Sequence, residues 1–233
     1  MKRITQEAWA LLALALAAGF VDALSYLGLG RVFTANMTGN TVLLGVAVAS
    51  GSSADALRAV ASLGGFVLGG GIGIVLIGAR RASWPRLTWP VFTLETGALL
   101  ALLIIWTVVG VDPVRYLLVV LSGLAMGAQS AATRVSTVPG VNTTYMTSTL
   151  LNAVARVVLR DREARQASEA SHLPGAALAI YAVGALAGAG AETAWHGAAA
   201  AVPLAIVVVV TALVARWRKN DRRAESGAAT RAP

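Results

Sequence analysis

The sequence contains no cysteine, and its only histidines are His172 and His196. Without cysteine the chain can have no disulfide, no thiolate nucleophile and no cysteine-ligated metal. The two histidines fall in expected loops or helix ends, with no cluster of carboxylates beside them. We therefore expect no metal site and no cofactor.

Charged residues are also scarce, at 13% of the 233 residues, whereas a soluble domain has roughly 25%. Hydrophobic residues make up 57% of the chain. Apolar runs long enough to cross a bilayer recur along it, and six spans of about 20 residues would use about half the chain. This composition predicts one integral membrane domain over residues 1–217, followed by a basic, disordered cytoplasmic tail over 218–233.

Acidic residues are outnumbered by basic ones, 11 to 19, which makes the formal net charge +8. Such a charge could attract nucleic acid, but here the basic residues form short clusters beside apolar runs, as the positive-inside rule describes. We therefore expect membrane orientation and no nucleic-acid binding. The clusters hold two residues at the N-terminus, three around Pro85, four between 156 and 165, and six between 216 and 231.

The expected fold is all-α, a polytopic bundle with spans at about 8–29, 56–77, 88–109, 114–135, 175–191 and 198–215. Two polar stretches lie between spans, and they either cross fully, giving eight helices, or re-enter on one side, leaving six. The six-span alternative places 15 of the 19 basic residues on one side, with both termini cytoplasmic, and we prefer it. Residues 1–110 and 113–217 would then each hold three spans and form an inverted 3+3 repeat.

Glycine is concentrated in the second expected span, between Gly64 and Gly73. Small residues three or four positions apart let membrane helices approach closely. A phosphate-binding glycine loop would need a preceding strand, and none is visible. The pattern therefore predicts close helix packing.

The two polar stretches are Phe33–Gly45 and Thr143–Leu151, in which Met37-Thr38 matches Met146-Thr147. Their polar side chains would be costly against lipid, so they should be buried in protein or line a watery cavity. We expect Thr38, and a residue near Thr147, to cap half-helices whose positive ends point to the bilayer centre. That arrangement favours an anion or a polar neutral solute.

The candidate pathway residues are the polar groups of these stretches and those inside the spans: Asp22, Asn36, Thr38, Asn40, Glu95, Gln129, Thr147 and Thr149. An ionisable group within a span marks a pathway, a proton relay or an ion pair. Asp22 could pair with Arg31 or Arg134, or it could titrate and couple transport to protons. The remaining polar groups could equally join helices by ordinary hydrogen bonds.

Four stretches together resemble the YoaK-like family of uncharacterised bacterial membrane proteins: Gly19–Ser25, Phe33–Asn40, Ala125–Gln129 and Thr143–Thr147. The resemblance covers about residues 8–215. It implies a multi-spanning protein of the bacterial cytoplasmic membrane with about six helices, and it implies no substrate or binding residues. Some relatives are closer to Met-Thr-Gly where this chain has Met146-Thr-Ser148.

Three functions are compatible with these features. The first is a small-solute permease or channel with a midplane site formed by the two Met-Thr stretches. The second is a non-transporting scaffold, sensor or partner subunit whose basic tail holds anionic lipid. A membrane enzyme is less favoured, because the sequence shows no nucleophile–base pair. The expected partners are a small polar or anionic solute and membrane lipid, and a homo-oligomer is compatible with all three.

Overall fold

The computed structural model of the protein describes residues 2–78, 83–136 and 172–229, and this part of the chain is helical with short connections. It contains six long helices, one short helix and a 3-10 helix: α1 (Lys2–Gly28), α2 (Met37–Ala49), α3 (Ser53–Ile77), α4 (Trp84–Val109), α5 (Arg115–Arg134), α8 (His172–Trp195), η2 (His196–Ala200) and α9 (Ala201–Ala229). The all-α membrane bundle predicted from the sequence is confirmed.

Hydropathy and length identify five stretches that can cross a membrane. The last of them, residues 175–221, contains both α8 and α9, which η2 joins at a turn. The short helix α2 has only 13 residues, so it is too short to span a bilayer. The helices thus match the six predicted spans and one of the two predicted broken segments.

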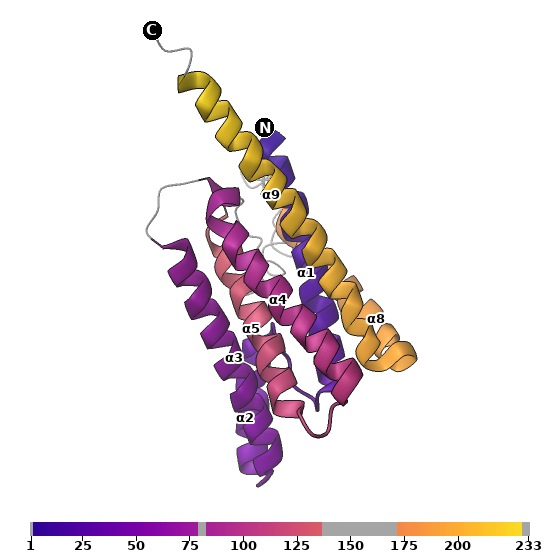
Figure 1. Cartoon of the computed structure of the whole chain (residues 1–233). Helices are drawn as coiled ribbons and strands as arrows, with labels where there is room; N and C mark the ends of the chain where they lie inside the picture. The colour runs from indigo at the N-terminus through magenta and orange to yellow at the C-terminus, as the bar shows by residue number, and fades with distance from the viewer. Residues whose placement is uncertain (1, 79–82, 137–171, 230–233) are drawn as a thin grey trace, which may run out of the picture.

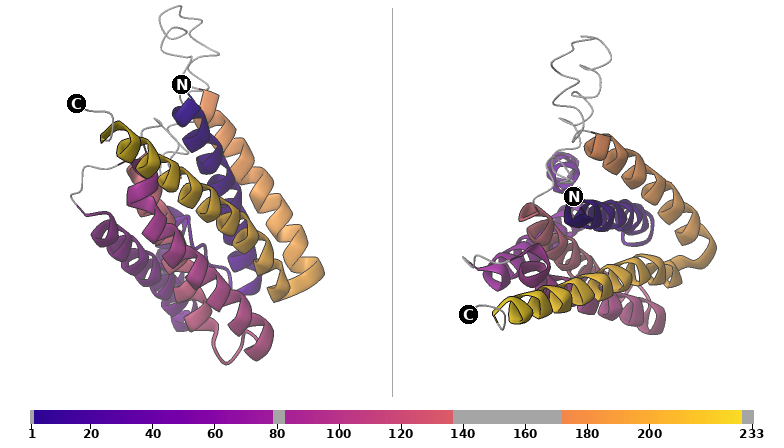
Figure 2. Two further views of the ribbon diagram at one scale, coloured as in Figure 1. Left: turned by 45° about the horizontal axis from the view of Figure 1, so that its top comes forward. Right: turned by 90° about the horizontal axis from the view of Figure 1, so that it is seen from above.

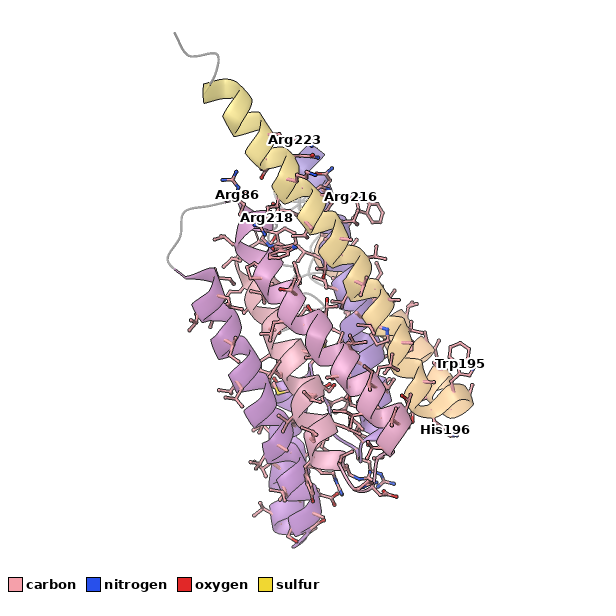
Figure 3. The ribbon with its side chains drawn as sticks, viewed as in Figure 1. Arg86, Trp195, His196, Arg216, Arg218 and Arg223 are labelled. Carbon is pink, nitrogen blue, oxygen red and sulfur yellow. The ribbon has the colours of Figure 1, made fainter. Side chains whose placement is uncertain are left out.

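The long helices run back and forth along one bundle, and the start of α1 and the end of α9 lie at the same end (Figure 1). We call this the terminal end and the opposite one the distal end. Four labelled arginines lie toward the terminal end, whereas Trp195 and His196 lie at the distal end (Figure 3). Those arginines are Arg86, Arg216, Arg218 and Arg223.

Two pairs of parallel helices form the tightest packing in the bundle, α3 with α5 and α1 with α8 (Figure 2). A Cβ atom added to Gly69 of α3 would lie 2.0 Å from the carbonyl oxygen of Leu124. One added to Gly184 of α8 would lie 2.2 Å from that of Leu16. The close packing predicted from the glycine pattern is therefore present, because only a missing side chain permits such backbone contact.

The most buried spans are α1 and α5, and the helices around them carry large exposed apolar side chains. Val67 and Val75 of α3 are 69% and 79% exposed, and Leu186 of α8 is 77% exposed. Water would make so much exposed apolar surface unfavourable, but a bilayer accommodates it. The outer faces of the bundle are therefore suited to lipid.

The structure differs from the sequence prediction at the tail. Helix α9 continues to Ala229, so residues 218–229, which the sequence predicted to be disordered, are helical. The guanidinium of Arg218 lies 4.5 Å from the centre of the Trp89 ring, a cation–π contact that holds α9 against α4. Alanine and arginine are strong helix formers, so the helix extends past the apolar run.

Candidate functional site

The chain re-enters the bundle directly after α1. The backbone N–H groups of Thr34 and Ala35 each donate to Oδ1 of Asp22 at 2.7 Å. Asp22 lies six residues before the end of α1, which is about 9 Å at 1.5 Å per residue. The segment between α1 and α2 thus turns back to the level of Asp22, as the sequence predicted for the first polar stretch, and α2 begins near that level with an exposed first turn.

Asp22 is only 2% exposed, and it anchors this segment. Besides the two backbone donors it accepts the hydroxyl of Tyr181 from α8. Neither of the arginines considered as its ion-pair partners is among these contacts. The carboxylate is therefore held by neutral donors from the re-entrant segment and from the neighbouring helix.

Asn40 is fully buried and fastens the other side of the segment. Its Oδ1 accepts from the Phe33 N–H at 2.9 Å, and its Nδ2 donates to the Phe33 carbonyl at 2.6 Å. Nδ2 also donates to Oγ of Ser62 on α3 at 2.9 Å. The Asn40 amide thus pairs with both the N–H and the carbonyl of Phe33. Its role is to position the segment rather than to line a path.

Asn36, and not Thr38, caps α2, which corrects the sequence prediction. Its Oδ1 accepts from the Gly39 N–H at 3.2 Å. Thr38 lies inside the first turn instead, and both side chains are exposed. The cap falls at Asn36 because Met37 already has helical geometry, so the preceding amide is the one placed to reach an unpaired backbone donor.

Three buried hydroxyls meet where the re-entrant segment contacts α1 and α5. Oγ of Ser25 lies 3.2 Å from Oγ1 of Thr34 and 3.3 Å from Oγ of Ser122. Ser122 in turn lies 2.9 Å from Thr34. No sequence pattern marks this cluster as a site, because a single Ser or Thr in an apolar helix is common and only the fold brings these three together.

One face of α5 carries a polar residue at every second turn: Arg115, Ser122 and Gln129. A seven-residue spacing keeps residues on one helix face, with about 10 Å between successive positions. Nε2 of Gln129 donates to the Leu14 carbonyl at 3.1 Å. Its Oε1 is buried and has no hydrogen-bond partner within the described residues.

Glu95 of α4 is fully buried, and neither of its carboxyl oxygens has a hydrogen-bond partner in the described part of the chain. The position of Glu95 along the bundle axis, its level, can be inferred from Val91, one turn earlier in α4. Val91 and Ala128 of α5 both lie within 4 Å of a Cβ built on Gly73, so these two residues share a level. Because α4 and α5 are antiparallel, one further turn along α4 corresponds to one turn back along α5. Glu95 therefore lies at a level between Ser122 and Gln129.

The structure thus brings Asp22, Asn36 and Asn40 together around the re-entrant segment and places Glu95 and Gln129 at neighbouring levels of the bundle. Thr147 and Thr149 lie outside the described residues. Within the described ranges, no group of three His, Asp or Glu side chains could hold a metal ion. The arrangement offers hydrogen bonds and charge.

Residues 10–214, which run from α1 into α9, match a protein family described as "Protein of unknown function (DUF1275)". The chain belongs to this family. The UPF0700 transmembrane protein YoaK of Bacillus subtilis (strain 168) is a relative, 31% identical over 198 residues, which are 83% of this chain and 88% of that protein. No solved structure matches the chain. The resemblance seen in the sequence is confirmed, and the chain is an integral membrane protein of this family.

The contacts of Asp22 predict how its replacements behave. The amide introduced in the D22N variant keeps an oxygen for the two backbone donors, so we expect the free energy of unfolding to fall by less than about 1.5 kcal/mol. D22L leaves those buried donors unpaired and should cost about 3 kcal/mol or more. Equilibrium unfolding in detergent measures both. A leucine variant as stable as the parent protein would contradict the anchoring role.

Proposed function

We propose that the protein is a permease or channel for a small polar or anionic solute. The observation that carries this proposal is that Arg115, Ser122 and Gln129 recur along one face of α5, while the buried Glu95 of α4 lies at a level between the last two. We call these four residues the polar column. These groups share one side of α5 or lie at its level on α4. Buried polar groups are expensive in a membrane, so a row of them supports a path for a solute.

Unpaired acceptors within the column strengthen the proposal. Both oxygens of Glu95 and Oε1 of Gln129 lack partners among the described residues. Most buried polar atoms in proteins are hydrogen-bonded, and an exception calls for a ligand, a water or a proton. In our proposal Glu95 takes up a proton or contacts the solute. Gln129 then replaces part of the hydration shell of the solute.

The start of α2 supplies the second element of the site. Its exposed N-terminal turn, with Asn36 and Thr38, leaves backbone N–H groups available and carries about half a positive charge. Transporters use the N-termini of broken helices in this way for anionic groups. This turn begins about 9 Å inside the distal end of α1, so it lies within the depth of the bundle on its distal side.

An inverted repeat is part of the same proposal, and the helix packing supports it. If α1, α3 and α4 correspond to α5, α8 and α9, a two-fold axis in the membrane plane exchanges the α3–α5 pair with the α1–α8 pair. Both pairs are parallel, and both have glycines four residues apart at the contact, Gly65 and Gly69 in one and Gly184 and Gly188 in the other. A solute site near such an axis is common in transporters.

The orientation we propose puts the terminal end in the cytoplasm of a bacterial cell, because the basic residues cluster there. Since the chain lacks cysteine, single cysteines can report this directly. We expect a membrane-impermeant maleimide added to intact cells to label S53C, at the distal start of α3. N220C, on the exposed part of α9, should react only after the cells are opened. Labelling of N220C from outside would reverse the orientation.

The test of transport uses purified protein in liposomes and a panel of small carboxylates, phosphates, amides and sugars. We expect saturable uptake of at least one of them, and at least a tenfold lower rate in E95Q, with E7Q near the start of α1 as the matched control. If well-folded protein moves no solute in the panel, the permease proposal fails and the scaffold or sensor alternative takes its place.

A further inference from the structure

A cavity with a volume of about 570 Å³ lies at the distal end of the bundle. Its lining includes Arg31, Arg58 and Arg115, which come from the re-entrant segment, α3 and α5. The remaining wall is mainly apolar, with Tyr26 from α1 and Val46 from α2. We propose that this cavity binds a small organic carboxylate, which makes it the outer recognition site of the solute path. The transport role rests on the proposed function, whereas the binding does not.

The guanidinium groups of Arg58 and Arg115 are drawn together over the backbone of Gly30. A Cβ built on Gly30 would lie 3.0 Å from Nε of Arg58 and 3.3 Å from Nη1 of Arg115. The two nitrogens are therefore no more than about 6.3 Å apart, which brings the two guanidinium groups within reach of one carboxylate. Two cations at this separation repel each other, and a bound anion removes that repulsion.

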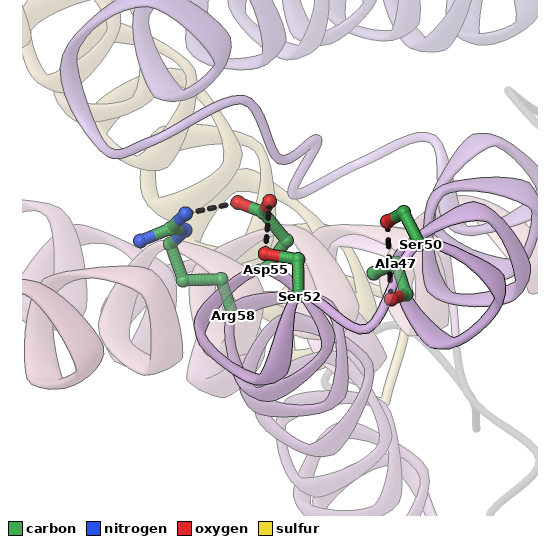
Figure 4. Close-up of polar contacts among 5 residues, drawn as sticks. All are labelled: Ala47, Ser50, Ser52, Asp55 and Arg58. Atoms are coloured by element: carbon green, nitrogen blue, oxygen red, sulfur yellow. Dashed lines mark hydrogen bonds and ion pairs between the residues drawn. The ribbon is translucent and has the colours of Figure 1, made fainter.

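The acidic neighbours do not balance the positive charge of the lining. Asp55 accepts from Ser52 at 2.5 Å and pairs with Arg58, as Figure 4 shows. This pair occupies Nη2 of Arg58, and Nε of the same side chain is buried against Gly30. Asp112, the partner of Arg115 at 2.6 Å, is 92% exposed and does not line the cavity. The lining therefore carries three arginines against the single carboxylate of Asp55.

The backbone of Arg31 is held in an unfavourable conformation. It has a positive φ of 63°, which a residue with a side chain adopts only at a cost. It forms no ion pair among the described side chains, yet it lies near enough to Asp55 to influence that carboxylate. Strained residues persist where the surroundings hold them for a function. Here the strained conformation places a third guanidinium at the cavity.

The shape of the cavity selects an organic anion over an inorganic one. Guanidinium groups match a planar carboxylate by paired N–H donors. The ring of Tyr26 is stacked on Phe33 with 5.2 Å between centroids, which fixes it as an apolar wall. A volume of about 570 Å³ holds a small organic molecule rather than a single ion. A carboxylate with a short apolar body would place its charge against the arginines and its hydrocarbon part against the apolar wall.

The test measures binding to the full chain in lipid nanodiscs by calorimetry, with butyrate, its neutral isostere butyramide, and inorganic phosphate as probes. We expect saturable binding of butyrate only. R115Q should weaken it at least tenfold, whereas R134Q, at the exposed opposite end of the same helix, should leave it unchanged. Equal binding of butyramide, binding of phosphate alone, or equal affinity in R115Q and R134Q overturns the proposal.

R31G separates binding from folding. Glycine accepts a positive φ, so this variant should be as stable as the parent protein or more stable, yet bind butyrate at least threefold more weakly. Unchanged affinity in R31G removes Arg31 from the site. Butyrate binding without uptake of any solute would end the proposed transport function and keep this site. Uptake at the parental rate in both R31G and R115Q would overturn the outer recognition site and leave transport standing.

Discussion

G69A is expected to destabilise the protein by about 3 kcal/mol or more, despite adding a single methyl group. A Cβ at this position would lie 2.0 Å from the carbonyl oxygen and 2.7 Å from the Cα of Leu124. Those atoms belong to the backbone of α5, so no side-chain rotation relieves the overlap. The two helices would have to separate, and the neighbouring contact of Gly127 with the Phe66 carbonyl would be lost as well.

Gly71 in the same helix provides the matched control, because a Cβ there meets nothing within 4 Å. G71A should be neutral, or should stabilise the protein by about 0.5–1 kcal/mol through the higher helix propensity of alanine. Equilibrium unfolding in mixed detergent micelles, followed by circular dichroism, compares the two. If both variants unfold alike, α3 and α5 do not pack as described.

N40L is expected to destabilise the protein by about 3 kcal/mol, because the fully buried amide is the partner of the Phe33 N–H. Leucine has no acceptor, and its branched end replaces a group that is in contact with Ser62. The re-entrant segment would lose its fastening to α2 and α3. We expect proteolysis or hydrogen exchange at the segment to rise together with the loss of stability.

The control for this prediction is T41V, one residue further along α2. The Thr41 hydroxyl is exposed and only donates to the Met37 carbonyl of its own helix, at 3.0 Å. Its removal should change the free energy of unfolding by no more than about 0.5 kcal/mol. N40D is the informative intermediate, since it keeps the acceptor for Phe33 but loses both donated hydrogen bonds. If N40L were as stable as the parent protein, residues other than Asn40 would have to hold the re-entrant segment in place.

The spans and the first re-entrant segment could be predicted because their signals are local. An apolar run of sufficient length predicts a span wherever it packs, and the polar stretch around Asn40 is costly in lipid whatever its neighbours are. The glycine-rich stretch of α3 predicted close packing for the same reason. The sequence prediction for the end of α9 was wrong, because the helix continues to Ala229. Low hydropathy indicates where a helix leaves the membrane, but it does not indicate where the helical conformation ends.

Roles within the site could not be predicted, because they depend on which residues meet. Asp22 was selected as an ionisable group, but its partner Tyr181 is 159 positions away, and only their contact shows that the carboxylate is held by donors. Ser122 and Thr34, 88 positions apart, carried no signal of their own. Glu95 was found by sequence, yet only packing reveals that its oxygens lack partners within the described residues.

The first polar stretch, Phe33–Gly45, shows where the two kinds of information divide. The sequence by itself determined a helical membrane protein and the interruption after its first span, since both follow from the cost of placing polar groups in hydrocarbon. Only the tertiary structure decided that Asn40 and Asp22 fasten this stretch, and that Arg31, Arg58 and Arg115 face one cavity. The physical reason is that hydropathy is a property of each residue, whereas hydrogen-bond satisfaction and converging charge are properties of pairs that folding brings together.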